Sequence, residues 1–157
     1  MRFSGLSCAF VLLISTSLLG CTHTPQAAKQ TNHIGDKVAN VAKQMVGTRY
    51  RFGGNHPKKG FDCSGLVQYS YKSAGVKVAR STQLQKRNSR LIAPGKMQKG
   101  DLLFFNQLGK RMSHVGIYIG NNKFVHAPSS GKYVRIDSLK TDYWRKHLAS
   151  IRRFTNL

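Results

Sequence analysis

The stretch HVGIYIGNNKFVH, from His114 to His126, alternates apolar with small or polar side chains and has a glycine at its midpoint. This pattern predicts a β-hairpin, and we expect its turn to be centred on Gly120. In that register Val115 faces Val125 and His114 faces His126, whose Cβ atoms would lie about 5 Å apart on one face of the sheet. A slip of one residue would send one histidine to the other face.

Other segments supply the rest of an α+β domain. Helical spacing of apolar residues predicts one helix over residues 36–47, a second over 62–74 and a short one over 81–86. Short apolar runs bounded by turn residues predict further strands, which are DLLFF (101–105), YVRIDSL (133–139) and LASIRRF (148–154). Because the helices come first and the strand connections are too short for parallel crossovers, we expect N-terminal helices packed on a central antiparallel β-sheet.

The N-terminal residues predict an exported protein. Arg2 precedes an apolar run over residues 8–20, which is too short for a comfortable membrane span and has the order of a secretory signal. The run ends in LLGC (18–21), which resembles the lipobox of bacterial lipoproteins, where the signal is cut before a cysteine that is then acylated. We therefore expect residues 1–20 to be a signal peptide and Cys21 to carry lipid. An ordinary secretory signal with an incidental cysteine is the alternative.

The residues that follow Cys21 bear on where the protein resides. Residues 21–35 are polar and small without an apolar period, which predicts a tether and leaves residues 36–157 as one domain. Thr22 stands where similar lipoproteins carry an aspartate that retains them in the inner membrane. We expect an outer-membrane lipoprotein that faces the periplasm, and the inner membrane is the less favoured alternative.

The charge of the chain is strongly one-sided. Its 157 residues include 26 Lys and Arg against 5 acidic residues, all of them aspartate, and the formal net charge is +21. A field of this sign attracts anionic polymers and membrane surfaces and opposes self-association, so we expect a monomer. Export argues against nucleic acid as the partner and leaves the cell wall, anionic lipid headgroups and lipopolysaccharide. The alternative is a solvated basic surface without a specific partner.

Cysteine usage singles out Cys63. Cys8 would leave with the signal and Cys21 would carry lipid, so Cys63 has no disulfide partner in an oxidising space. Asp62 is a good N-cap, which places the thiol at a helix start, where free N–H groups and the helix dipole favour a thiolate and can bind an oxyanion. The charge of Asp62 opposes the thiolate, so a nearby imidazolium would have to lower the thiol pKa.

The two hairpin histidines are candidate partners for Cys63. His114 would take the thiol proton as general base, and His126 would orient His114. Alternatives remain: Cys63 could be a small core residue, the histidines could be hydrogen-bonded strand residues, or all three could be zinc ligands. Their spacing is not that of a metal motif and a fourth ligand is missing, so we expect neither a metal nor another cofactor.

The motifs around these residues resemble the NlpC family of cell-wall hydrolases, also called the NlpC and p60 family, which has a papain-like core. The resemblance covers residues 38–154 and rests on GTRYRFGG (47–54), FDCSGLVQ (61–68), RSTQLQ (80–85), KGDLLFF (99–105), SHVGIYIGNNKFVHA (113–127) and RRF (152–154). The order Cys, His, His resembles that of the small lipoprotein murein endopeptidases of Gram-negative bacteria. Ala79 departs from the family pattern, which often has proline there.

The resemblance implies the nucleophile, base and orienting residue named above. It also implies that Tyr50 directs its hydroxyl toward the oxyanion or substrate, and that Asp62 and Ser64 line the acyl-donor side. The implied activity is hydrolysis of peptidoglycan peptides through a thioester acyl-enzyme, at the D-alanyl to meso-diaminopimelate bond of cross-links. Hydrolysis of the γ-D-glutamyl-diaminopimelate bond of stem peptides and a catalytically inactive, wall-binding lipoprotein are the alternatives.

Overall fold

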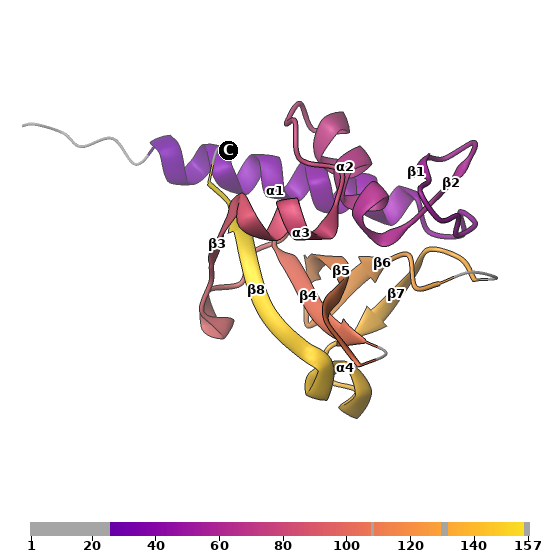
Figure 1. Cartoon of the computed structure of the whole chain (residues 1–157). Helices are drawn as coiled ribbons and strands as arrows, with labels where there is room; N and C mark the ends of the chain where they lie inside the picture. The colour runs from indigo at the N-terminus through magenta and orange to yellow at the C-terminus, as the bar shows by residue number, and fades with distance from the viewer. Residues whose placement is uncertain (1–25, 108, 130–131, 156–157) are drawn as a thin grey trace, which may run out of the picture.

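The computed structural model describes residues 26–107, 109–129 and 132–155 and shows helices packed against an antiparallel sheet (Figure 1). Helix α1 (Gln26–Gln44) and helix α2 (Cys63–Ser73) lie on one side of the sheet, and helix α4 (Asp142–His147) lies at the opposite end. The arrangement confirms the predicted α+β class. The predicted signal peptide, residues 1–20, and Cys21 lie outside the described residues.

Helix α1 begins at Gln26, so the predicted helix start at Asp36 is wrong. The segment 26–35 has no apolar period, and periodicity therefore could not detect the helix there. Asp36 forms an ion pair with Lys99 at 3.0 Å instead of capping the helix. Gly35 lies inside the helix, where a Cβ would come within 2.2 Å of the Lys99 carbonyl oxygen, so this close contact requires glycine. The division of the chain into signal, tether and domain stays a prediction.

The helix predicted to follow Asp62 is confirmed with its ends. Asp62 caps α2 and accepts a hydrogen bond from the backbone amide of Gly65, and Gly75 follows the helix with a φ of +90°. Ser81 caps the short helix α3 (Thr82–Arg87) in the same way. The first of these caps matters most, because it fixes Cys63 at the first position of α2.

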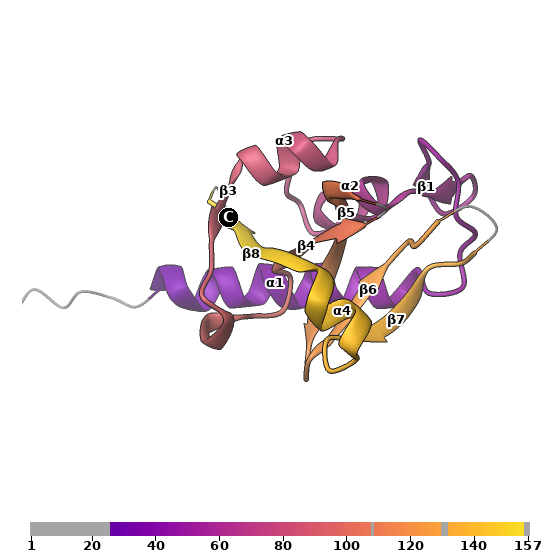
Figure 2. The ribbon, with the colours of Figure 1, turned by 60° about the horizontal axis from the view of Figure 1, so that its bottom comes forward.

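The main sheet has six strands, and every pairing in it is antiparallel. Its strands, in spatial order, are β3 (Ser89–Leu91), β8 (Leu148–Phe154), β4 (Leu102–Gln107), β5 (Lys110–Gly120), β6 (Lys123–His126) and β7 (Arg135–Ser138). The predicted strands are confirmed. We did not predict helix α4, strand β3, the short 3-10 helix Pro94–Lys96 or the small pair formed by β1 (Asn55–His56) and β2 (Gly60–Phe61). Figure 2 shows β8 running from α4 toward β3 and α3.

The β5–β6 hairpin turns at Asn121 and Asn122, so the register centred on Gly120 is wrong. Both asparagines have positive φ, 52° and 55°, which suits a two-residue turn that matches the strand twist. Ile117 pairs with Val125, which places His126 in line with Gly116 and diagonal to His114. Because the register differs from the predicted one by two residues, both histidines keep the same face.

The core lies on both faces of the sheet. Val115 and Ile117 of β5 pack with α1 and α2 on one face, whereas Tyr118 and Phe124 pack with Trp144 of α4 on the other. Strand alternation assigns His114 and His126 to the second face. Among the described helices, none is long and apolar enough to cross a membrane.

Candidate active site

Cys63 is half-buried at the start of α2 and faces strand β5. Its sulfur accepts a hydrogen bond from the backbone amide of Val115, the residue after His114, and lies 3.9 Å from Oγ1 of Thr82. Within the described residues, no hydrogen bond joins Cys63 to His114; such catalytic bonds are often long without substrate. Burial raises the pKa of the thiol, and the hydrogen bond from Val115 opposes this only in part.

Asp62 precedes Cys63, and both of its carboxylate oxygens accept hydrogen bonds. Its two carboxylate oxygens accept hydrogen bonds from the amides of Gly65 (2.7 Å) and Gly53 (2.9 Å). Arg80 forms two further bonds to the carboxylate, at 2.9 and 2.6 Å, and donates to the hydroxyl of buried Ser64 at 2.9 Å. The charge that we expected to oppose a thiolate is therefore paired with a guanidinium. Asp62 and Ser64 are both bound to Arg80, and their place on the acyl-donor side stays a prediction.

The two histidines form a buried pair. Nε2 of His114 lies 2.8 Å from Nδ1 of His126. His114 is 3% exposed and His126 is fully buried. Burial and the neighbouring His126 lower the pKa of His114 to about 3, and burial lowers the pKa of His126 to about 4. Both rings are therefore neutral near pH 7. The imidazolium that was expected to lower the thiol pKa is absent from this state, which corrects that expectation.

Behind the pair stands Asp137 of β7. Nε2 of His126 lies 2.9 Å from Oδ2 of Asp137, which also accepts hydrogen bonds from Trp144 Nε1 (3.0 Å) and from Arg135 (2.9 and 3.1 Å). The Trp144 ring covers both histidines, with ring centroids 6.0 Å from His114 and 4.8 Å from His126. A continuous chain of hydrogen bonds thus runs from His114 to a carboxylate.

Tyr50, like Cys63, is partly buried against the core that α1 and α2 share with the sheet. Its backbone forms an isolated parallel bridge with Phe61, and its amide donates to the carbonyl of Lys132 at 2.8 Å. Burial raises the pKa of its hydroxyl, and a charge on Cys63 raises it further, so the two groups are close. The phenol therefore stays protonated and can donate a hydrogen bond near the sulfur.

A family model that describes the NlpC/P60 family matches residues 47–153, a range that contains Cys63, His114 and His126. The chain belongs to the NlpC/P60 family. This membership confirms the resemblance drawn from the sequence motifs, and the structures of other members confirm the α+β papain-like fold.

Two Escherichia coli proteins are similar to this chain over most of its length. "Murein DD-endopeptidase MepH" is 37% identical over 151 residues, which are 93% of this chain and 54% of MepH. "Murein DD-endopeptidase MepS/Murein LD-carboxypeptidase" is 43% identical over 121 residues, 76% of this chain and 63% of that protein. The chain thus spans about half the length of MepH.

A solved NlpC/P60 structure gives the same result for the fold. The crystal structure of an NlpC/P60 family protein from Bacillus cereus has a TM-score of 0.69 and 34% sequence identity, and covers 76% of this chain and 40% of that one. The match extends to other bacteria: a probable endopeptidase NlpC homolog of Haemophilus influenzae is 40% identical over 85% of this chain and 71% of its own length.

Four residues near the site were not singled out from the sequence. Arg80 and Thr82 lie in the quoted RSTQLQ motif, and a counter-ion for Asp62 was the signal that could have identified Arg80. Asp137 lies on β7 and Trp144 on the unpredicted α4. Only the hydrogen bonds of Asp137 with His126 and with Trp144 show that these two residues belong to the site. Among the described residues, no three His, Cys, Asp or Glu side chains gather where they could hold a metal ion.

Proposed function

We propose that this chain is a peptidoglycan endopeptidase that uses Cys63 as its nucleophile. The observation that carries the proposal is the buried His114–His126 pair on β5 and β6, beside a cysteine capped at the start of α2, in a chain that belongs to the NlpC/P60 family. Relatives named murein DD-endopeptidases support a cross-link as the substrate.

The reaction divides into two acyl-transfer steps. As the sulfur of Cys63 attacks the carbonyl carbon, its proton passes to His114, because the raised thiol pKa and the lowered histidine pKa favour a neutral pair beforehand. The C–N bond then breaks, the amine leaves with the proton from His114, and a thioester remains. Water, deprotonated by His114, attacks the thioester and releases the carboxylic acid and the thiol.

The oxyanion of each tetrahedral intermediate needs hydrogen-bond donors. The backbone N–H group of Cys63 at the start of α2 and the Tyr50 hydroxyl are the donors that we assign to it. Asp62 and Ser64, held by Arg80, would shape the acyl-donor side through their shared network.

The amine side of the substrate would lie toward His114, because this residue protonates the leaving amine. A cavity of about 490 Å³ is lined by Asp137 and Trp144, which contact the histidine pair, and by the cations of Lys132 and Arg135. A leaving diaminopimelate residue carries a carboxylate next to its amine, and a cationic wall suits such a group.

We propose the D-alanyl to meso-diaminopimelate bond as the target. Hydrolysis of the γ-D-glutamyl-diaminopimelate bond is the alternative, supported by relatives in Bacillus subtilis named gamma-DL-glutamyl hydrolase and bifunctional muramidase/DL-endopeptidase CwlT, 42% and 40% identical to this chain. Digestion of purified cross-linked and uncross-linked muropeptides, with products identified by mass spectrometry, separates the two bonds. If the wild type is active, a Cys63→Ala variant with the same activity would refute the thioester mechanism. If the wild type cleaves neither bond, the remaining alternative is a catalytically inactive, wall-binding protein.

We further propose that the protein is anchored through Cys21 to the outer membrane and acts in the periplasm. The lipobox-like LLGC and Thr22 support this location. A Cys21→Ser variant should then appear in the soluble periplasmic fraction, and unchanged membrane association would contradict the anchor.

A further inference from the structure

Asp137 is a carboxylate with an unusual number of donors on one oxygen. Its Oδ2 accepts from His126, from the indole of Trp144 and twice from Arg135, at 2.9 to 3.1 Å. Burial works to raise the pKa of Asp137, but the hydrogen bonds from His126 and Arg135 outweigh it and hold the pKa below its ordinary value. The group is therefore an ionised carboxylate near neutral pH, and an ionised carboxylate only accepts hydrogen bonds.

This restriction determines where the protons of the histidines sit. The 2.9 Å contact with Asp137 requires a proton on Nε2 of His126. A neutral imidazole carries only one proton, so Nδ1 of His126 has a lone pair and accepts from Nε2 of His114 across 2.8 Å. Nε2 of His114 then holds the only proton of that ring, and its Nδ1 is left as a base.

Without the carboxylate, the opposite proton arrangement becomes available. A proton on Nδ1 of His126 would be donated to Nε2 of His114, which would place the proton of His114 on Nδ1 and remove the basic lone pair from that atom. A histidine in the wrong tautomer is a poor general base even when its position is unchanged. Arg135 and Trp144 serve this arrangement by holding Asp137 in place.

We propose that Asp137 is a positioning residue, which fixes His126 as the Nε2–H tautomer and thereby leaves Nδ1 of His114 free to accept the proton of Cys63. The inference rests on the proposed function and adds to it a carboxylate that the Cys, His, His order does not contain. Asp137 also lines the cavity that we assign to the leaving amine, but in this scheme it contacts neither the thiol nor the reacting carbonyl group. It acts through His126, and the other charged or titratable groups around that ring are His114, Arg135 and Lys132.

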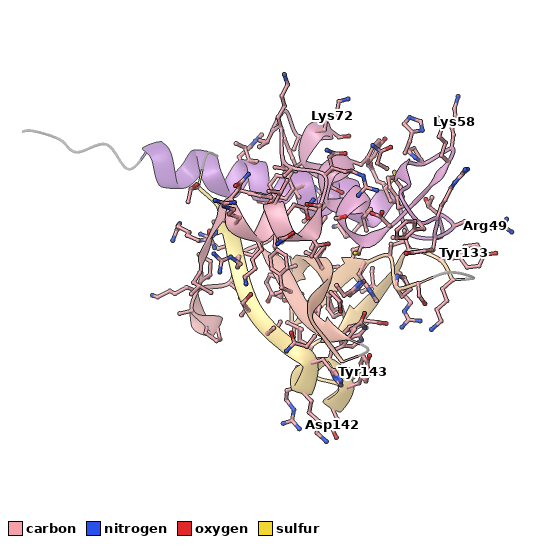
Figure 3. The ribbon with its side chains drawn as sticks, in the orientation of Figure 1. Arg49, Lys58, Lys72, Tyr133, Asp142 and Tyr143 are labelled. Carbon is pink, nitrogen blue, oxygen red and sulfur yellow. The ribbon has the colours of Figure 1, made fainter. Side chains whose placement is uncertain are left out.

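The test compares Asp137→Asn with Asp142→Asn in the full chain. Asp142 is a matched control because it is 74% exposed on α4, points away from the body of the protein and pairs only with Arg145 among the described residues (Figure 3). For Asp137→Asn we expect kcat for muropeptide hydrolysis to fall about 10²- to 10⁴-fold with KM within about twofold of the wild type. Asp142→Asn should match the wild type, and Asp137→Glu, which retains the charge, should recover part of kcat.

A second measurement reads the protons directly. In ¹H–¹⁵N spectra of the histidine rings at pH 7, we expect Nε2 to carry the proton in both His114 and His126 of the wild type, and this arrangement to be lost in Asp137→Asn. A proton on Nδ1 of His126 in the wild type would overturn the proposal, as would an Asp137→Asn variant with kcat within about threefold of the wild type. The spectra decide even if Asp137→Asn fails to fold, and they do not depend on whether muropeptides are the substrate.

Discussion

Acidification should destabilise this protein through His114 and His126. Both rings are neutral in the folded state because burial lowers their pKa from 6.5 to about 3 and about 4. In the unfolded chain both rings bind protons as the pH falls through 6.5, so the unfolded state is stabilised and the free energy of unfolding decreases. Between pH 7 and pH 5 the linkage relation gives about 2 kcal/mol for each ring and about 4 kcal/mol for the pair. Asp137 does not offset this loss, because its pKa lies below 3.8 and it stays ionised over this range.

Urea denaturation of the purified protein at pH 7, 6 and 5 measures the effect. A His126→Asn variant should lose about half of the pH dependence, whereas His56→Gln, a change at an exposed residue of β1, should keep all of it. A wild-type free energy of unfolding that changes by less than about 1 kcal/mol between pH 7 and pH 5 would show that the rings are not buried as neutral groups, and would refute the reasoning.

Four further outcomes are expected. Gly65→Ala should lower the free energy of unfolding by about 2 kcal/mol or more in urea, because its Cβ would lie 2.0 Å from the carbonyl oxygen of Gly54, whereas Gly95→Ala, with no atom within 4 Å, should change it little. Arg80→Gln should slow alkylation of Cys63 by iodoacetamide and move its pH dependence upward, because the Asp62 charge would lose its partner; an unchanged rate profile would contradict this. Lys132→Gln should raise KM for diaminopimelate-containing muropeptides more than it lowers kcat, and the reverse pattern would argue against a binding role. Sedimentation with purified sacculi should show binding that weakens steeply as NaCl rises above about 0.1 M, where the Debye length is about 10 Å, and salt-independent binding would count against an electrostatic role.

The local signals in the sequence predicted the parts of the site that local structure determines. A cap at Asp62 is enough to place Cys63 at a helix start, and strand alternation is enough to place His114 and His126 on one face, even though the turn at Asn121 and Asn122 was missed. Alternation survived the error because the register differed by two residues, an even number.

Contacts between distant segments could not be predicted in this way. Asp137 reaches His126 because β7 pairs with β6 with Phe124 opposite Asp137, and that register is set by tertiary packing rather than by a turn motif. Trp144 enters through α4, whose six residues are too few for a helical period. The same holds for Arg80, which meets Asp62 only after α2 and α3 have packed together.

The distribution of the five aspartates connects the chemistry with the charge of the whole chain. Each aspartate forms an ion pair, with partners Lys99, Arg80, Arg153, Arg135 and Arg145 for Asp36, Asp62, Asp101, Asp137 and Asp142. Two of the five, Asp62 and Asp137, lie next to the thiol and the histidine pair, and each of them is paired with a guanidinium. Among the residues that the structure describes, no lysine or arginine other than these five partners forms an ion pair with a carboxylate.

The positive field is therefore a property of the surface rather than of the catalytic groups. Electrostatic attraction to an anionic wall or membrane should depend on the summed surface charge and on salt, whereas proton transfer from Cys63 should depend on the short-range bonds around Asp62 and Asp137. A Cys63→Ala protein should accordingly keep the salt-dependent binding of the wild type to sacculi while losing hydrolysis. If binding disappeared together with catalysis, the two properties would share the same residues, and the separation of surface charge from site chemistry would be wrong.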